Sequence, residues 1–282
     1  MNTMEILKNT VTRLSRNYYF ERVNENYRRE ILQEVEKSHD IKLFKERAES
    51  LLENGFLILD EYFKAELPAM KKDFESILKE PCEVGGEYNS VLLPRKYLSK
   101  SEVFSRIGFD MYCLYLIRYY WGRKITLAQT HGLRIDPATK EDAATKVENS
   151  ASIWHDDGNG KQVKMFVLLT DVTENDQGTE IIPKTNKLYH NKRMQSNGGF
   201  STLLTDEEAA KLGKAIQVCA KAGSAVIFDT NTIHRASRKE NGKTRDAWIY
   251  YYTSGRYLFN LDYHPNVRQS LTAFQRQVGR IS

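Results

Sequence analysis

The stretch WHDDG at residues 154–158 indicates the fold and the chemistry of this chain most directly. In an extended strand, residues i and i+2 point to the same side, so His155 and Asp157 can hold one metal ion while Asp156 points away. A third ligand would come from a neighbouring strand, and His234 is the obvious candidate. Two histidines and one carboxylate leave the other metal positions open, which is the ligand set of non-haem Fe(II) oxygenases.

Chance often places a histidine and an aspartate two residues apart. The spacing alone therefore leaves open that His155 and His234 are structural histidines, and the surrounding sequence has to decide. His131 is as readily a pocket residue as a packed one.

Composition bounds the class of protein. A chain of 282 residues, 40% hydrophobic and 11% aromatic, can bury a large core and is typical of a globular protein. No apolar run is long enough to cross a membrane, and the amino terminus lacks the pattern of a signal peptide. Cys82, Cys113 and Cys219 have no metal-like spacing, which predicts unpaired thiols in a cytoplasmic protein. The net charge of +5 permits an anionic substrate, and no pattern predicts nucleic-acid binding.

The predicted elements run helices first and strands afterwards. Helical spacing occurs within residues 1–50, 44–53, 64–79 and 101–120, and residues 81–94 are predicted as a loop. Strands are predicted at residues 56–59, 125–135, 163–172, 179–183, 216–220, 224–229, 232–237 and 245–252. This order predicts an α+β chain with a mainly β core, a jelly-roll double sheet flanked by N-terminal helices.

No linker rich in glycine, proline or serine divides the chain. We therefore expect residues 1–50 to form a helical extension packed on a jelly-roll domain at residues 51–254. A basic tail is expected at residues 255–282, where arginines outnumber acidic residues.

Two blocks of sequence carry a resemblance. The first contains WHDDG, then VLLTD at residues 167–171 and GTEIIPKTN at residues 178–186. The second runs from KAGSAVIFD at residues 221–229 through His234 to Arg245. In this order, over roughly residues 51–253, they resemble the phytanoyl-CoA dioxygenase family.

The resemblance implies a double-stranded β-helix, similar to a cupin, that binds Fe(II) and uses 2-oxoglutarate and O2 as cosubstrates. It implies that His155, Asp157 and His234 are the iron ligands and that Arg245 pairs with the far carboxylate of 2-oxoglutarate. The chemistry of the arginine agrees, because a guanidinium offers a bidentate fork to a carboxylate.

One position departs from the family pattern. Many members carry a hydroxyl residue two positions after the distal histidine, whereas this chain has Ala236 there. Thr130 on the upstream strand is one candidate to replace that hydroxyl. Thr130 and Arg134 share one face of that strand by the two-residue period, with Gln129 and His131 on the other face.

We therefore expect an Fe(II)- and 2-oxoglutarate-dependent dioxygenase that hydroxylates an unactivated C–H bond of a small-molecule or carrier-linked substrate, releasing succinate and CO2. The same centre could instead catalyse desaturation, cyclisation or epimerisation. A non-catalytic jelly-roll binding protein is the alternative from another class, but it would have no reason to keep the triad and Arg245. Substrate contacts are expected from residues 1–50, 80–100, 137–150 and 184–204.

Overall fold

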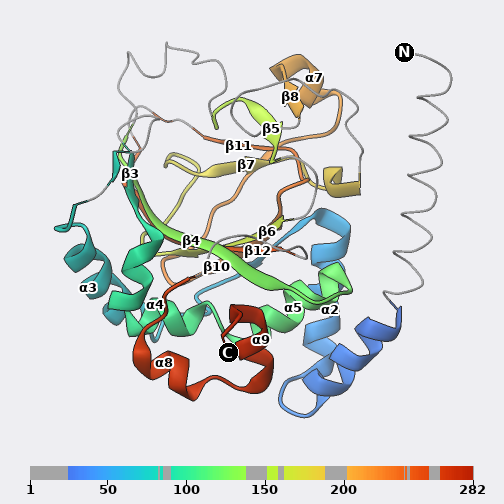
Figure 1. Cartoon of the computed structure of the whole chain (residues 1–282). Coiled ribbons are helices and arrows are strands. Elements are labelled where there is room, and N and C mark those ends of the chain that lie inside the picture. The colour runs from blue at the N-terminus through green and yellow to red at the C-terminus, as the bar shows by residue number, and fades with distance from the viewer. Residues whose placement is uncertain are drawn as a thin grey trace, which may run out of the picture.

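Two antiparallel sheets face each other, and helices cover the outer face of the larger sheet (Figure 1). The computed structural model describes residues 25–81, 83–84, 90–137, 151–157, 162–187, 202–237, 239, 242–253 and 261–281. The helices are residues 25–36, α2 (Ile41–Asn54), α3 (Leu67–Ile77), α4 (Glu102–Ile107), α5 (Met111–Trp121), α7 (Asp206–Ala210), α8 (Pro265–Ser270) and α9 (Ala273–Gly279), with 3-10 turns η1 (Arg95–Lys100) and η2 (Thr185–Lys187).

The larger sheet has seven strands in the order β1-β10-β6-β12-β4-β3-β2, and the smaller has five in the order β8-β5-β11-β7-β9. The predicted class, a mainly β core flanked by helices, is confirmed. The strands are β1 (Phe56–Leu59), β2 (Glu83–Val84), β3 (Ser90–Leu93), β4 (Thr126–Ile135), β5 (Trp154–Asp156), β6 (Gln162–Leu168), β7 (Thr179–Ile181), β8 (Thr202–Leu204), β9 (Ile216–Gln217), β10 (Ala225–Asp229), β11 (His234–Ala236) and β12 (Arg245–Thr253).

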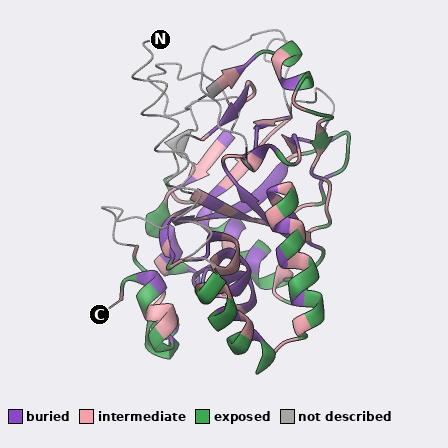
Figure 2. Ribbon diagram, turned by 90° about the vertical axis from the view of Figure 1, so that its right-hand side faces the viewer, coloured by how far each residue is buried: buried purple, intermediate pink, exposed green. Residues whose placement is uncertain are grey.

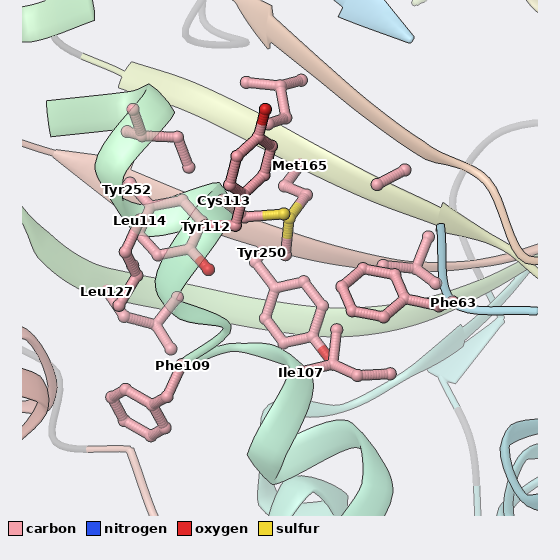
Figure 3. Close-up of a cluster of buried hydrophobic side chains, with 14 of the residues drawn as sticks. Phe63, Ile107, Phe109, Tyr112, Cys113, Leu114, Leu127, Met165, Tyr250 and Tyr252 are labelled. Atoms are coloured by element: carbon pink, nitrogen blue, oxygen red, sulfur yellow. The ribbon is translucent and has the colours of Figure 1, made fainter. Parts of the chain in front are cut away.

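The side chains of β6 point alternately into two layers of the core. Met165 and its alternate neighbours in β6 pack toward the helices, in a large cluster with Tyr250, Tyr252 and residues of α5 (Figure 3). Phe166 and Leu168 point the opposite way, into a smaller apolar cluster between the two sheets. Successive side chains of a strand point to opposite faces, so one strand serves both layers.

The region predicted as a single helix over residues 101–120 is two helices. Ser101 accepts a hydrogen bond from the Phe104 N–H and begins α4, whereas Asp110 accepts one from the Cys113 N–H and begins α5. Each side chain satisfies a backbone donor that a helix start leaves without a partner, so each can begin a new helix. The prediction failed because apolar spacing continues across the break.

The loop predicted at residues 81–94 is wrong in part, because β2 and β3 lie there and extend the larger sheet beside β4. In the register of the pair, Leu93 lies opposite Gly132. A methyl group at Gly132 would approach the Leu93 Cδ1 atom to 2.7 Å, so the glycine makes room for that side chain. Pairing with an available strand edge creates these strands, and a short segment of sequence does not reveal that edge.

Helix α2 ends where the sequence predicts, at Asn54 followed by Gly55. Gly55 has a φ of 80°, a left-handed conformation that glycine adopts at little cost. The helix begins three residues earlier than predicted, because Asp40 accepts hydrogen bonds from the Lys42 and Leu43 N–H groups. Residues 1–24 and most of the predicted loops at 137–150 and 184–204 lie outside the described residues.

The end of the chain belongs to the helix-side core. Tyr263, Val267, Leu271 and Val278 are buried in the same cluster as α5 and the larger sheet. Figure 2 shows many exposed residues on the helices in the lower half of the view and mainly buried or intermediate residues along the central strands. The division at residues 50 and 254 stays a prediction. None of the described helices is long and apolar enough to cross a membrane.

Candidate metal centre

The residues predicted as metal ligands meet in the smaller sheet, where β5 and β11 are neighbours (Figure 1). His155 and His234 lie directly opposite each other in this antiparallel pair, and Asp157 follows the end of β5. One side-chain nitrogen or oxygen from each residue lies within 4.8 Å of the other two. The Asp157 Oδ1 atom is 3.4 Å from His155 Nε2 and 3.6 Å from His234 Nε2.

Both histidines are held by the same local contact. The His155 Nδ1 atom lies 2.6 Å from the Ile153 carbonyl, and the His234 Nδ1 atom lies 2.8 Å from the Thr232 carbonyl. A carbonyl oxygen only accepts, so each Nδ1 carries the proton and donates it. The Nε2 atom of each ring is then the lone-pair nitrogen that a metal requires.

The charge state of His234 also suits a metal ligand. Burial is the main reason that the pKa of His234 falls to about 3, against a smaller opposing effect of Asp157. The imidazole is therefore neutral near pH 7, and a metal need not displace a proton from it.

The spacing of the three atoms fits a metal. Nitrogen and oxygen ligands at ~2.0–2.2 Å from a divalent ion lie about 3 Å apart when they occupy adjacent octahedral positions. The two separations from Asp157 Oδ1 exceed that value by about half an ångström, a difference that small side-chain rotations close. All three ligands come from the end of one strand pair, so the opposite side of such an ion would be open to cosubstrates.

A cation that the sequence analysis did not single out contacts one of these three residues. The ammonium group of Lys164, on β6, forms an ion pair with Asp157 Oδ2, and both side chains are only 15% exposed. Burial alone would raise the pKa of Asp157, but attraction by the Lys164 ammonium lowers it well below its usual range. The sequence signal was a lysine among alternating apolar residues on the inward face of β6.

Aromatic rings of the larger sheet surround this lysine. In register, Phe228 of β10 and Tyr251 of β12 lie opposite Lys164, with ring centroids 5.9 and 5.1 Å from its ammonium nitrogen. His131 lies with its ring centroid 5.3 Å from that of Tyr251. Burial, with repulsion from Lys164, lowers the pKa of His131 to about 4. His131 therefore faces the metal side as a neutral ring.

An apolar pocket extends from Phe228, whose ring contacts that of His234, to Arg245. Its lining combines side chains of both sheets: Phe166, Leu168, Val172, Thr179, Ile181, Val218, Val226, Phe228 and Arg245. Arg245 is buried, and burial lowers its pKa to about 10, so it is charged near pH 7. Its NH1 atom donates to Thr179 Oγ1 at 3.4 Å, and its Nε atom has no partner within the described part of the chain.

The structure does not place Thr130 in the pocket that contains Arg245. The Thr130 hydroxyl donates to the Ile249 carbonyl at 2.8 Å and accepts from Trp248 Nε1 at 2.7 Å, on the helix-covered face of the larger sheet. Arg134 lies on the same face and forms a bidentate pair with Asp246, at 2.7 Å for both contacts. The two-residue period grouped these side chains correctly, but on the face away from the triad.

Thr179, which the sequence analysis did not consider, places a hydroxyl beside Arg245. In the β7–β11 pair, Thr179 lies directly opposite Ala236, and opposite residues of an antiparallel pair point to the same face. Its hydroxyl contacts Arg245, as described above. The sequence analysis missed Thr179 because only the pairing of two strands distant in sequence places Thr179 beside Ala236.

A jelly roll with two histidines and one carboxylate converging beside an apolar pocket defines the class of non-haem iron oxygenases. The model of the phytanoyl-CoA dioxygenase family matches residues 51–247. The chain therefore belongs to that family. No curated protein sequence gives a significant match.

Solved structures agree with the fold. The epimerase SnoN, in complex with Fe3+, α-ketoglutarate and nogalamycin RO, has a TM-score of 0.61 at 15% identity and covers 80% of this chain and 88% of its own. EctD from S. alaskensis, with 2-oxoglutarate and 5-hydroxyectoine, has a TM-score of 0.56 at 17% identity, covering 74% and 75%. HygX from Streptomyces hygroscopicus, with nickel, 2-oxoglutarate and hygromycin B, has a TM-score of 0.51 at 18% identity, covering 77% and 88%.

At the level of the family, the prediction of an iron- and 2-oxoglutarate-dependent oxygenase is confirmed. Those three solved structures contain small molecules, which agrees with the coarser prediction of a small-molecule substrate.

Proposed function

We propose that this oxygenase hydroxylates an unactivated C–H bond of a small-molecule or carrier-linked substrate, with His155, Asp157 and His234 as the Fe(II) ligands. Arg245 binds the far carboxylate of 2-oxoglutarate. The observation that carries the proposal is the buried Arg245, which has no carboxylate partner among the described residues and lies at the opposite end of the pocket from the triad. A buried charge is costly unless it is paired, so the pocket is built for a ligand that brings an anion.

The metal, the polar residues and the apolar residues of the site have different tasks. The bound iron, with 2-oxoglutarate and O2, supplies the oxidising power, with succinate and CO2 as products. Arg245 and Thr179 orient the far carboxylate, and the apolar side chains between them and the triad exclude water. Loss of water strengthens the charged contacts at both ends, because the effective dielectric constant is lower.

The same metal centre can catalyse a different reaction, and solved structures with a similar fold support this as a second candidate function. SnoN is an epimerase, and SnoK, with a TM-score of 0.56 at 17% identity, is described as a carbocyclase. Epimerisation, cyclisation or desaturation by this chain would need the same triad and Arg245. The substrate bound beside the metal would determine which of these reactions takes place.

The test is turnover of 2-oxoglutarate under defined conditions. We expect purified protein loaded with Fe(II) to release succinate slowly without substrate and faster when a screened small molecule fits the pocket. Mass analysis of that molecule distinguishes a gain of one oxygen from a loss of two hydrogens or an unchanged mass. If succinate forms no faster than with metal-free protein across the screen, and metal-loaded protein binds no 2-oxoglutarate, the proposal fails.

The role of Thr179 gives a milder, independent prediction. Replacing Thr179 with valine removes one hydroxyl and should weaken 2-oxoglutarate binding by ~3- to 10-fold, the usual value of one hydrogen bond. Thr130→Val is the matched control, because that hydroxyl already bonds Trp248 and Ile249 on the other face. Calorimetric titration of both variants measures the effect. A larger loss in Thr130→Val than in Thr179→Val would return the cosubstrate role to Thr130.

A further inference from the structure

Lys164 occupies a position where the fold alone does not call for a lysine. It lies on β6, which pairs with β10 on one side and β12 on the other. On the same face, Phe166 and Leu168 are apolar and pack between the sheets. Lysine is rarely buried unless it is paired, and here its partner is a predicted metal ligand.

The two oxygens of Asp157 are divided between different neighbours. Oδ1 faces the two histidine nitrogens at 3.4 and 3.6 Å, whereas Oδ2 contacts the Lys164 ammonium. A carboxylate can bind a metal through one oxygen or both. With Oδ2 held by Lys164, only Oδ1 is available on the metal side.

The lysine is itself held in place. Its ammonium lies near the rings of Phe228 and Tyr251, on the strands that flank β6. The aromatic faces attract the cation and limit its movement. A cation fixed by two flanking strands can determine the orientation of a carboxylate that follows the short strand β5.

We propose that Lys164 is a positioning residue: it holds Asp157 as a one-oxygen ligand and favours binding of anionic 2-oxoglutarate beside the metal. This inference rests on the proposed function of the triad. A one-oxygen ligand leaves one more metal position open than a two-oxygen ligand, and 2-oxoglutarate needs two positions when it chelates.

The charge of Lys164 acts in opposite directions on the two ligands. An ammonium group beside Asp157 repels a divalent cation but attracts the carboxylate that binds next to it. Removing the charge and freeing Oδ2 should therefore strengthen metal binding and weaken cosubstrate binding. A variant that merely loosens the site would weaken both.

The experiment compares Lys164→Met, Lys164→Arg and Lys221→Met, the last removing a lysine that is 67% exposed and pairs with Asp171. Titrations under anaerobic conditions measure the affinity for Co(II) and then the affinity of the Co(II)-loaded protein for 2-oxoglutarate. For Lys164→Met we expect unchanged or tighter Co(II) binding and ~10-fold weaker 2-oxoglutarate binding, the effect of one nearby charge. Lys164→Arg should stay within about threefold of the parent, and Lys221→Met should match it.

The visible absorption of bound Co(II) is a further readout, because it changes with the number of ligands. We expect a changed spectrum in Lys164→Met and a parent-like spectrum in Lys164→Arg. If Lys164→Met does not fold, Lys164→Gln replaces it. Glutamine keeps an N–H donor for Oδ2 without the charge, so the spectrum should stay parent-like while 2-oxoglutarate binds more weakly.

Three results would overturn the inference. Lys164→Met could lose Co(II) and 2-oxoglutarate affinity in parallel, or it could bind 2-oxoglutarate within twofold of the parent. The third is a Lys164→Arg variant as impaired as Lys164→Met. Failure of the proposed function is a different result, since the parent protein itself would then bind no 2-oxoglutarate.

Discussion

Replacing Arg245 with alanine will weaken the binding of 2-oxoglutarate to the metal-loaded protein by at least about a hundredfold. Removing one partner of a buried ion pair costs ~3–5 kcal/mol, and each ~1.4 kcal/mol is a factor of ten in affinity. Arg245 is buried in the apolar pocket, so water cannot replace the lost guanidinium easily. Metal affinity should change far less, because Arg245 lies at the opposite end of the pocket from the triad.

Anaerobic calorimetric titration measures this effect. The control is Arg134→Gln, which removes an arginine on the strand next to Arg245 but on the opposite face, where it pairs with Asp246. Its affinity for 2-oxoglutarate should equal that of the parent. Binding by Arg245→Ala within about threefold of the parent would remove this arginine from the cosubstrate site.

Replacing His155 with alanine will reduce 2-oxoglutarate-dependent turnover to background while the chain still folds. The imidazole supplies one of three metal contacts, and its other ring nitrogen bonds a carbonyl two residues away. Asp157→Ala should abolish turnover equally but unfold at a lower temperature, because Lys164 then loses its carboxylate partner.

Succinate release and thermal unfolding, measured on the same preparations, separate loss of chemistry from loss of structure. Glu180→Ala is a control in the same sheet, since Glu180 pairs with Arg235 rather than with the triad. Succinate release by His155→Ala at the parent rate would show that the triad is not the reaction centre.

The sequence predicted the parts of the fold that depend on local signals. Asp40, Asn54 and Gly55 mark the limits of α2 through capping groups and a left-handed glycine, both readable over a few residues. Strand β3 could not be predicted in this way, because it is a strand only where the edge of β4 is available to Leu93 and its neighbours. Local propensity contains no information about an edge that is distant in sequence.

The same distinction applies to the site. The shared direction of His155 and Asp157 was predictable, because residues i and i+2 of one extended segment point to the same side. Thr179 was not predictable, because its place beside Arg245 depends on the register of β7 against β11. The face of Thr130 also depended on register, in a pair of strands that carries an irregularity between Tyr251 and Tyr252.

The hydrogen bonds that fix the two imidazoles have a consequence for how this centre tolerates change. Each acceptor is a main-chain carbonyl two residues before its histidine, at Ile153 and at Thr232. Every amino acid carries that carbonyl, so no substitution at either position deletes the acceptor. The protonation pattern of the ligands is thus inherited with the backbone path. A substitution at Ile153 or Thr232 therefore leaves the proton on the same nitrogen of each imidazole.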